Sequence, residues 1–198
     1  MKIHFFELDI FQLNELFMKK IAVVFDTTYG HTQVIANKVL DGLASTKLEA
    51  KIFAVKDINA NAELLNDLEK YDGIIFGSPT YMGSVSAEFK KFMDSTSGVW
   101  FQQKWKDKIA AGFTNSGSLS GDKSNTLATL FTFACQHSMV WVSQGIFPNG
   151  ELNRIGSWVG LMAQSDNAPV EQTPPESDKK YAFEFGKRVA EFVLTKLK

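Results

Sequence analysis

The 198-residue chain is poor in the residues that make disulfides and metal sites. It has one cysteine, Cys135, which excludes an internal disulfide and fits a reducing compartment. Its three histidines are His4, His31 and His137, and their spacing is not that of ligands to one metal ion. We therefore predict no metal site.

Net charge and long apolar runs are lacking as well. The formal net charge is −1 and no predicted helix carries a basic stripe, so nothing favours a nucleic-acid partner. No segment is long and apolar enough to span a bilayer. Glu7, Asp9 and Glu15 interrupt any apolar core of a signal peptide. We expect a cytoplasmic protein with no nucleic-acid or membrane partner.

What the chain does contain is an ordinary soluble composition with many aromatic residues. Its hydrophobic content is 44%, and it has 17 phenylalanines and four tryptophans. Its length suits one domain, which we place at residues 18–198 after an N-terminal extension, residues 1–17. Aromatic surfaces around Trp100 and Trp158 predict self-association as a homodimer or homotetramer.

Apolar strands alternate with amphipathic helices along most of the chain. We expect strands at 21–25, 49–55, 74–77, 108–113 and 139–142, helices at 32–44, 62–68, 85–93, 124–137 and 177–196, and a loop at 143–177. Such alternation predicts an α/β fold with a five-stranded parallel sheet, right-handed crossovers and helices on both faces. In such sheets ligands bind outside the carboxyl ends of the strands.

The turn after the first strand is the leading candidate for a phosphate site. It consists of Thr27, Thr28, Tyr29, Gly30, His31 and Thr32. Hydroxyls and a glycine at a helix N-terminus suit an anion, because free backbone N–H groups and the helix dipole point at it. The turn holds no lysine or arginine, so dipoles and hydroxyls would hold the phosphate alone. The other interpretation is a plain capping turn, since threonine and glycine favour any strand-to-helix junction.

Two further loops follow the third and fourth strands. Their candidate residues are Pro79, Thr80, Tyr81, Met82 and Gly83 in the first, and Thr114, Asn115, Ser116, Gly117, Ser118 and Gly121 in the second. Each alone could be a surface connection. Because all three loops lie at carboxyl ends of neighbouring strands, they predict one shared site.

Other catalytic interpretations fail on spacing. The stretch 117–124 looks like an ATP-binding P-loop, but three residues separate its glycines rather than four, and Asp122 precedes the lysine. A phosphatase built on Cys135 needs an arginine six residues later, where Trp141 stands. A receiver domain needs several acids at strand ends, and Asp26 is alone.

With these loops in view, the chain resembles the flavodoxin-like NAD(P)H:quinone oxidoreductases of the tryptophan-repressor-binding-protein (WrbA) family. The matching segments, in order, are the turn 27–32, Pro79-Thr80-Tyr81-Met82-Gly83, Ser97-Gly98-Val99-Trp100, the loop 114–121 and Gln136-His137-Ser138-Met139. The match covers about residues 19–142. It implies a flavodoxin-like three-layer sandwich with strand order 2-1-3-4-5.

The resemblance also implies the chemistry. The turn 27–32 would hold the phosphate of FMN, and the loops 79–83 and 114–121 would line its ring. NADH or NADPH would reduce the flavin and a quinone would then reoxidise it, in a two-electron ping-pong order. In the family the tryptophan matched by Trp100 lies over the flavin of a neighbouring subunit, so Trp100 and Tyr81 are the predicted substrate contacts. Trp100 could equally be a core or subunit-contact anchor.

His137 is the predicted catalytic residue, as a hydrogen-bond or proton donor to the reduced quinone. It could equally be a helix C-terminal histidine that satisfies backbone carbonyls. The alternatives to a reductase are a flavodoxin-type electron carrier and a non-enzymatic FMN-binding regulatory protein. Flavodoxin carriers are strongly acidic, and a net charge of −1 speaks against one.

The chain departs from the family at two places. Tyr81 stands where the family has an arginine, and Ala163-Gln164-Ser165-Asp166 replaces its Gly-Gly-Asp-Gly stretch. We expect the substrate preference and the entrance for the nicotinamide nucleotide to differ accordingly.

Overall fold

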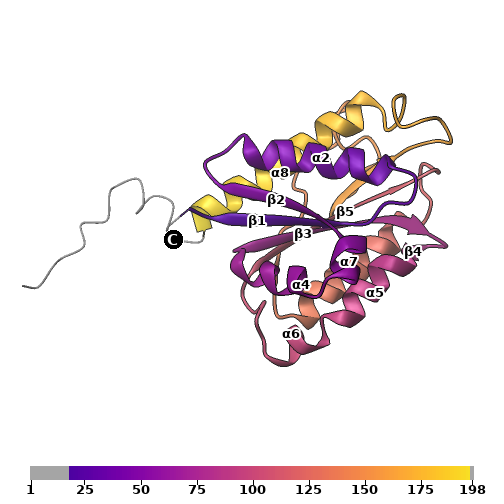
Figure 1. The fold of residues 1–198 in the computed structure, drawn as a ribbon. Coiled ribbons are helices and arrows are strands. Elements are labelled where there is room, and N and C mark those ends of the chain that lie inside the picture. Colours follow the sequence, from indigo (N-terminus) through magenta and orange to yellow (C-terminus); the bar gives the residue numbers. More distant parts are fainter. Residues whose placement is uncertain (1–17, 197–198) are drawn as a thin grey trace, which may run out of the picture.

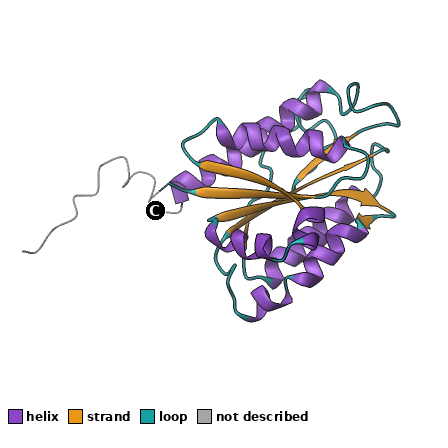
Figure 2. Cartoon of the chain, viewed as in Figure 1, coloured by secondary structure: helices purple, strands orange, loops and turns teal. Residues whose placement is uncertain are grey.

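A computed structural model describes residues 18–196, so the predicted extension, residues 1–17, lies outside the described residues. A sheet lies between two layers of helices (Figures 1 and 2). The strands are β1 (Lys20–Phe25), β2 (Glu49–Ala54), β3 (Gly73–Tyr81), β4 (Ser84–Val85), β5 (Ile109–Ser116), β6 (Val140–Trp141) and β7 (Leu161–Gln164). The helices are α2 (His31–Ala44), α3 (Val55–Ala60), α4 (Glu63–Asp67), the 3₁₀ turn η1 (Leu68–Lys70), α5 (Ala87–Ser95), α6 (Ser97–Phe101), α7 (Lys123–Gln136) and α8 (Glu176–Lys196).

The sheet order confirms the predicted flavodoxin-like fold. The strands run β2-β1-β3-β5-β6, and the pairs along this path are parallel. Helices α2 and α8 cover one face, and α5, α6 and α7 lie on the other (Figure 1). Seven strands replace the predicted five, because β4 forms a short hairpin with β3 and the fifth position is divided.

The divided edge strand corrects the prediction of a single fifth strand at 139–142. β6 pairs only with the start of β5, through Val140 opposite Ile109. β7 pairs with the end of β5, through Leu161 opposite Phe113. The predicted loop 143–177 therefore contains a strand, whose four residues are too short to stand out in the sequence.

Several other boundaries differ from the predictions, and α6 was not predicted. β3 continues from the predicted 74–77 to Tyr81, because the chain stays extended through Pro79 before it turns back. The predicted helix 62–68 is two short pieces, α4 and η1, and the unpredicted α3 precedes them.

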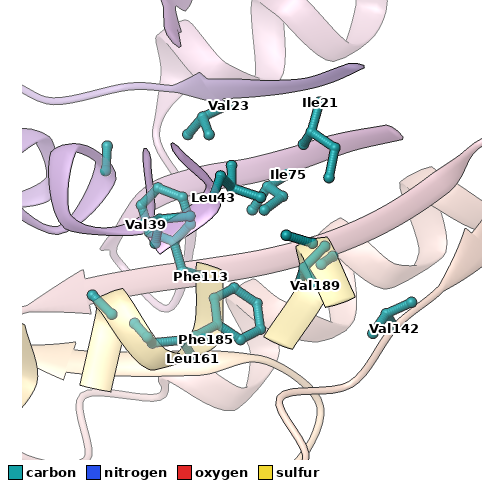
Figure 3. Packing of buried hydrophobic residues seen from close by; sticks show 14 of the residues in the cluster. Ile21, Val23, Val39, Leu43, Ile75, Phe113, Val142, Leu161, Phe185 and Val189 are labelled. Carbon is teal, nitrogen blue, oxygen red and sulfur yellow. The ribbon is translucent and has the colours of Figure 1, made fainter. Parts of the chain in front are cut away.

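Alternate residues of the buried strands feed two separate cores. In β1, Ile21 and Val23 face α2 and α8, whereas Ala22 and Val24 face α5 and α7. The first core is mainly aliphatic and includes Val39 and the other residues labelled in Figure 3. The sheet is thus buried on both faces, which leaves its carboxyl edge for a site.

Candidate functional site

The three predicted loops meet at the carboxyl edge of the sheet and enclose a pocket of about 410 Å³. We call it the carboxyl-edge pocket. Its lining residues are Thr27, Tyr29, His31, Thr32, Pro79, Thr80, Tyr81, Asn115, Ser116, Gly117, Ser165, Asp166 and Asn167. Ten of the seventeen residues predicted for the cofactor are in this set. Thr28, Gly30, Met82, Gly83, Thr114, Ser118 and Gly121 belong to the same loops without lining the pocket.

The turn before α2 forms an uncapped helix N-terminus at the pocket. Gly30 is the N-cap in the left-handed conformation, with φ 89°, and no side chain caps the helix. The Thr27 hydroxyl accepts the Gly30 N–H at 3.0 Å, which shapes the turn without satisfying the helix. The first free N–H groups of α2 and the positive end of its dipole therefore face an anion site. No lysine or arginine lines the pocket.

The second loop is a tight hairpin between β3 and β4. Its two central residues, Met82 and Gly83, both have positive φ, 48° and 77°, which is the pattern of a type I′ turn. The Met82 side chain is fully exposed, and Tyr81 is 37% exposed beside the pocket. The hairpin thus presents a ring and a thioether at the pocket mouth.

The third loop continues from β5. Asn115, Ser116 and Gly117 reach the pocket, whereas Thr114 lies below it and is fully buried. The Thr114 and Thr80 hydroxyls are 2.7 Å apart, and this contact joins the second and third loops beneath the pocket. Thr114 therefore supports the site rather than contacting its ligand.

A fourth wall was missed from the sequence. Ser165, Asp166 and Asn167 follow β7 and line the pocket. The Ser165 hydroxyl donates to the Asn115 side-chain oxygen at 2.9 Å, and His31 Nε2 lies 3.0 Å from the Ala168 carbonyl. A short apolar strand followed by Ser-Asp-Asn was the available signal, because it repeats the strand-then-polar-loop pattern of the other walls.

His137 and Trp100 lie elsewhere, in a groove between α5, α6 and α7. This groove measures about 550 Å³, and we call it the α5–α7 groove. Its lining residues are Met93, Asp94, Thr96, Ser97, Trp100, Asn125, Ala128, Thr129, Thr132, Phe133, Gln136 and His137. His137 ends α7, whose 14 residues span about 20 Å, whereas the third loop lies at its start. The structure therefore does not bring His137 to the pocket of its own chain.

His137 lies in the wall of the α5–α7 groove but is almost entirely buried, mainly against aromatic rings. The ring is 2% exposed, lies 4.5 Å from the Trp105 ring and 4.9 Å from the Phe133 ring, and burial lowers its pKa to about 4. Its Nε2 is 2.9 Å from the Thr96 hydroxyl, whose own proton goes to the Met93 carbonyl at 2.7 Å. Nε2 therefore donates to Thr96, which leaves a neutral ring with Nδ1 as an unpartnered acceptor. This state does not suit the predicted proton donor.

Residues 18–196 contain neither a cluster of metal ligands nor a helix that could span a membrane. Within that range no cluster of three or more His, Cys, Asp or Glu side chains could hold a metal ion. None of the helices in the same range has the length and apolar character needed to cross a membrane.

Comparisons with known proteins give relatives among flavodoxins and flavin-dependent reductases. The sequence profile of the NADPH-dependent FMN reductase family matches residues 6–152. A Pseudomonas aeruginosa protein named Flavodoxin FldP is 37% identical over 87% of this chain and 96% of its own. An NAD(P)H dehydrogenase (quinone) of Archaeoglobus fulgidus is 31% identical over 88% of this chain and 97% of its own.

A solved structure agrees with both. The crystal structure of a flavodoxin, WrbA-like protein from Agrobacterium tumefaciens superposes with a TM-score of 0.73 at 37% identity, covering 89% of this chain and 98% of that one. The resemblance inferred from the sequence is confirmed at the level of fold and family.

Proposed function

The chain belongs to the NADPH-dependent FMN reductase family, and from this premise we propose that its carboxyl-edge pocket holds FMN for the NAD(P)H-dependent reduction of quinones. Membership makes the protein an FMN-dependent oxidoreductase with NAD(P)H as electron donor. The observation that carries the proposal is the uncapped N-terminus of α2, which opens into a pocket without lysine or arginine side chains.

The residues present fit FMN. The turn 27–32 would hold the phosphate, because its hydroxyls and the first N–H groups of α2 replace the missing cations. The loops 79–83 and 114–121, together with 165–167, would hold the ring from its edges. When bound, FMN supplies hydride chemistry: it takes a hydride from NAD(P)H and returns two electrons to the acceptor.

The protein's task is then to orient the two substrates in turn. Tyr81 is half-exposed at the pocket mouth, so its ring can contact a planar nicotinamide or quinone. One open mouth serves both substrates, which supports a ping-pong order. The hydroxyl-rich walls exclude no water by themselves, and a cover is needed from elsewhere.

We propose that a second subunit provides this cover. Trp100 is 44% exposed and Phe101 is 81% exposed, on a helix that is remote from the chain's own pocket. The fully exposed Met82 at the pocket mouth is the matching apolar surface. A homodimer or homotetramer would place Trp100 of one subunit over the pocket of another, and sedimentation of the purified protein tests this.

For His137 we propose a supporting role in place of proton donation. Its ring fills the space between Trp105 and Phe133, and its Nε2 proton fixes Thr96, the residue before α6. His137 would thereby hold the helix that presents Trp100.

A flavodoxin-type carrier is the second candidate, favoured by the 37% identity to Flavodoxin FldP. Turnover separates the two. A reductase with FMN oxidises NADH or NADPH at about 1–1000 per second when benzoquinone is present. A carrier binds FMN and shows negligible oxidation. The donor that supports turnover also decides between NADH and NADPH.

The FMN site is tested by a carboxylate placed in its phosphate turn. Thr28 is exposed, so Thr28→Glu should fold normally yet repel the phosphate, weakening FMN binding about 100-fold. Thr129→Glu is the matched control, because it adds the same charge at a half-buried position in the α5–α7 groove. Fluorescence titration with FMN gives both affinities. Equal affinities in the two variants would place the phosphate elsewhere.

We also propose a cytoplasmic location, on the ground that the chain uses a single cysteine, Cys135. Fractionation of the source cells, followed by immunodetection, tests it.

A further inference from the structure

Lys123, the first residue of α7, is a fully buried lysine beside the carboxyl-edge pocket. Its ammonium donates to the Ser118 carbonyl at 2.6 Å and to the Ser116 hydroxyl at 2.9 Å. Both partners are neutral groups. Burying an ammonium without a carboxylate partner is costly, and desolvation lowers the pKa of Lys123 to about 8. The buried ammonium therefore suggests a function beyond the stability of the loop.

The third loop is wrapped around this ammonium. Gly121 and Asp122 both have positive φ, 55° and 53°, and turn the chain back toward Ser116. A Cβ at Gly121 would come within 2.5 Å of the Ser116 hydroxyl oxygen, so the return is close. Ser116 therefore contacts Lys123 on one side and lines the pocket on the other. One layer of loop separates the charge from the ligand space.

The field of Lys123 is only partly offset by neighbouring charges. The charged groups that act on it are Asp178 of α8 and Arg154 from the segment between β6 and β7, and their effects oppose each other. These two groups also pair with one another, with Arg154 Nε 2.7 Å from the Asp178 carboxylate. No lysine or arginine lines the pocket itself. Lys123 instead places a positive charge directly behind the lining, because its ammonium donates to the hydroxyl of the pocket-lining Ser116.

We propose that Lys123 is an electrostatic positioning residue that stabilises the reduced, anionic form of the bound flavin relative to the oxidised form. The inference rests on the proposed function, in that it requires FMN in the carboxyl-edge pocket. A hydride brings two electrons and one proton to a neutral ring, so NAD(P)⁺ leaves and the ring keeps one negative charge. A buried cation behind the ring-lining loop favours that charge, and it acts strongly because little water screens it.

The test compares two variants that remove the charge. Lys123→Gln keeps a hydrogen-bond donor, and Lys123→Met keeps the shape of the stem with neither donor nor charge. Lys90→Gln, on the exposed face of α5, is the control with the same change of net charge. For each protein we would measure the affinity for oxidised FMN by titration and the two-electron midpoint potential of the bound flavin.

Both Lys123 variants should bind reduced FMN about tenfold more weakly relative to oxidised FMN than the unmodified protein does. For a two-electron couple this is a fall of about 30 mV in midpoint potential. Lys90→Gln should leave the potential unchanged. If one Lys123 variant does not fold, the other decides alone.

An unchanged potential in a folded Lys123 variant, with or without loss of affinity for oxidised FMN, would overturn the inference and leave Lys123 as a structural support for the loop. The failure of the proposed function is a different result, namely no FMN binding by the unmodified protein.

Discussion

The two faces of the sheet are closed to different degrees. On one face α2 and α8 cross with their backbones in near contact, because a Cβ at Gly42 would lie 2.0 Å from the Phe183 carbonyl oxygen and one at Gly186 would lie 2.1 Å from that of Val39. On the other face the α5–α7 groove separates the helices by a space of about 550 Å³. A Cβ at Gly98 in α6 would meet nothing within 4 Å.

The residues of the two cores explain the difference. On the closed face Gly42 and Gly186 let two helices approach, and mainly aliphatic side chains such as Val39 and Val189 fill the space beneath them (Figure 3). The open face is built from edge-to-face aromatic contacts, for example Phe76 with Phe133 at 5.2 Å. These rings fill the space between the sheet and the helices α5 and α7.

The two faces also differ in what they contribute to the proposed function. The closed face fixes α2, whose N-terminus forms the phosphate turn of the carboxyl-edge pocket. The open face leaves Trp100 and its neighbours for contact with another molecule. One face therefore holds the proposed cofactor in place, and the other is available for assembly.

The largest expected effect comes from adding a methyl group to the closed face. Gly42→Ala should lower the free energy of unfolding by about 3 kcal/mol, because the new Cβ meets backbone atoms of α8 that cannot rotate away. Gly98→Ala is the matched change on the open face and should raise it by about 0.5–1 kcal/mol, since alanine suits a helix better than glycine. Urea unfolding of both variants measures the contrast. Equal effects would show that Gly42 is packed no more closely than the exposed Gly98.

Regular elements of the fold were predictable because hydrophobic periodicity was strong there. The strand 21–25 and the helix 32–44 agree with β1 and α2 to within one residue at each end. The divided edge strand was not predictable, because β7 depends on pairing with β5 from a distant part of the chain. A four-residue strand carries too little periodicity to compete with the prolines and glycines around it.

The site could be predicted only where it depends on local sequence and not on long-range pairing. Residues of the turn 27–32 come together through local chain geometry, and the sequence shows that geometry directly. Asn167 enters the pocket through the long-range pairing of β7, and His137 leaves it because α7 carries it about 20 Å away. The sequence did not point to Asn167, and it does not show that α7 runs away from the carboxyl edge and carries His137 with it.

The next largest effect is a pH dependence of the free energy of unfolding, which comes from His137 on the open face. His137 has a pKa of about 4 when folded, below its unfolded value near 6.5, so the unfolded chain binds the proton first as pH falls. The folded protein should therefore lose about 2 kcal/mol of stability from this group between pH 7.5 and pH 5. His137→Phe, which keeps a ring beside Trp105, should remove that component.

Urea unfolding of both proteins at the two pH values gives the measurement, and other titrating groups cancel in the difference. A variant as acid-sensitive as the unmodified protein would mean that His137 is protonated in the folded state. Such a result would restore the proton-donor role predicted from the sequence.

The smallest effect tests whether the open face completes the pocket of a neighbour. Trp100→Ala should raise the KM for the quinone about 3–10-fold, which corresponds to the roughly 0.5–1.5 kcal/mol that ring stacking adds, and should leave the affinity for FMN nearly unchanged. Phe131→Ala is the control, because Phe131 is similarly exposed (42%) but lies outside both the groove and the pocket. If the quinone KM rose and the affinity for FMN fell together in Trp100→Ala, or if both variants behaved alike, the open face would be serving the stability of its own chain. A change confined to the quinone KM of Trp100→Ala requires contact between Trp100 and a pocket that its own chain cannot place beside it.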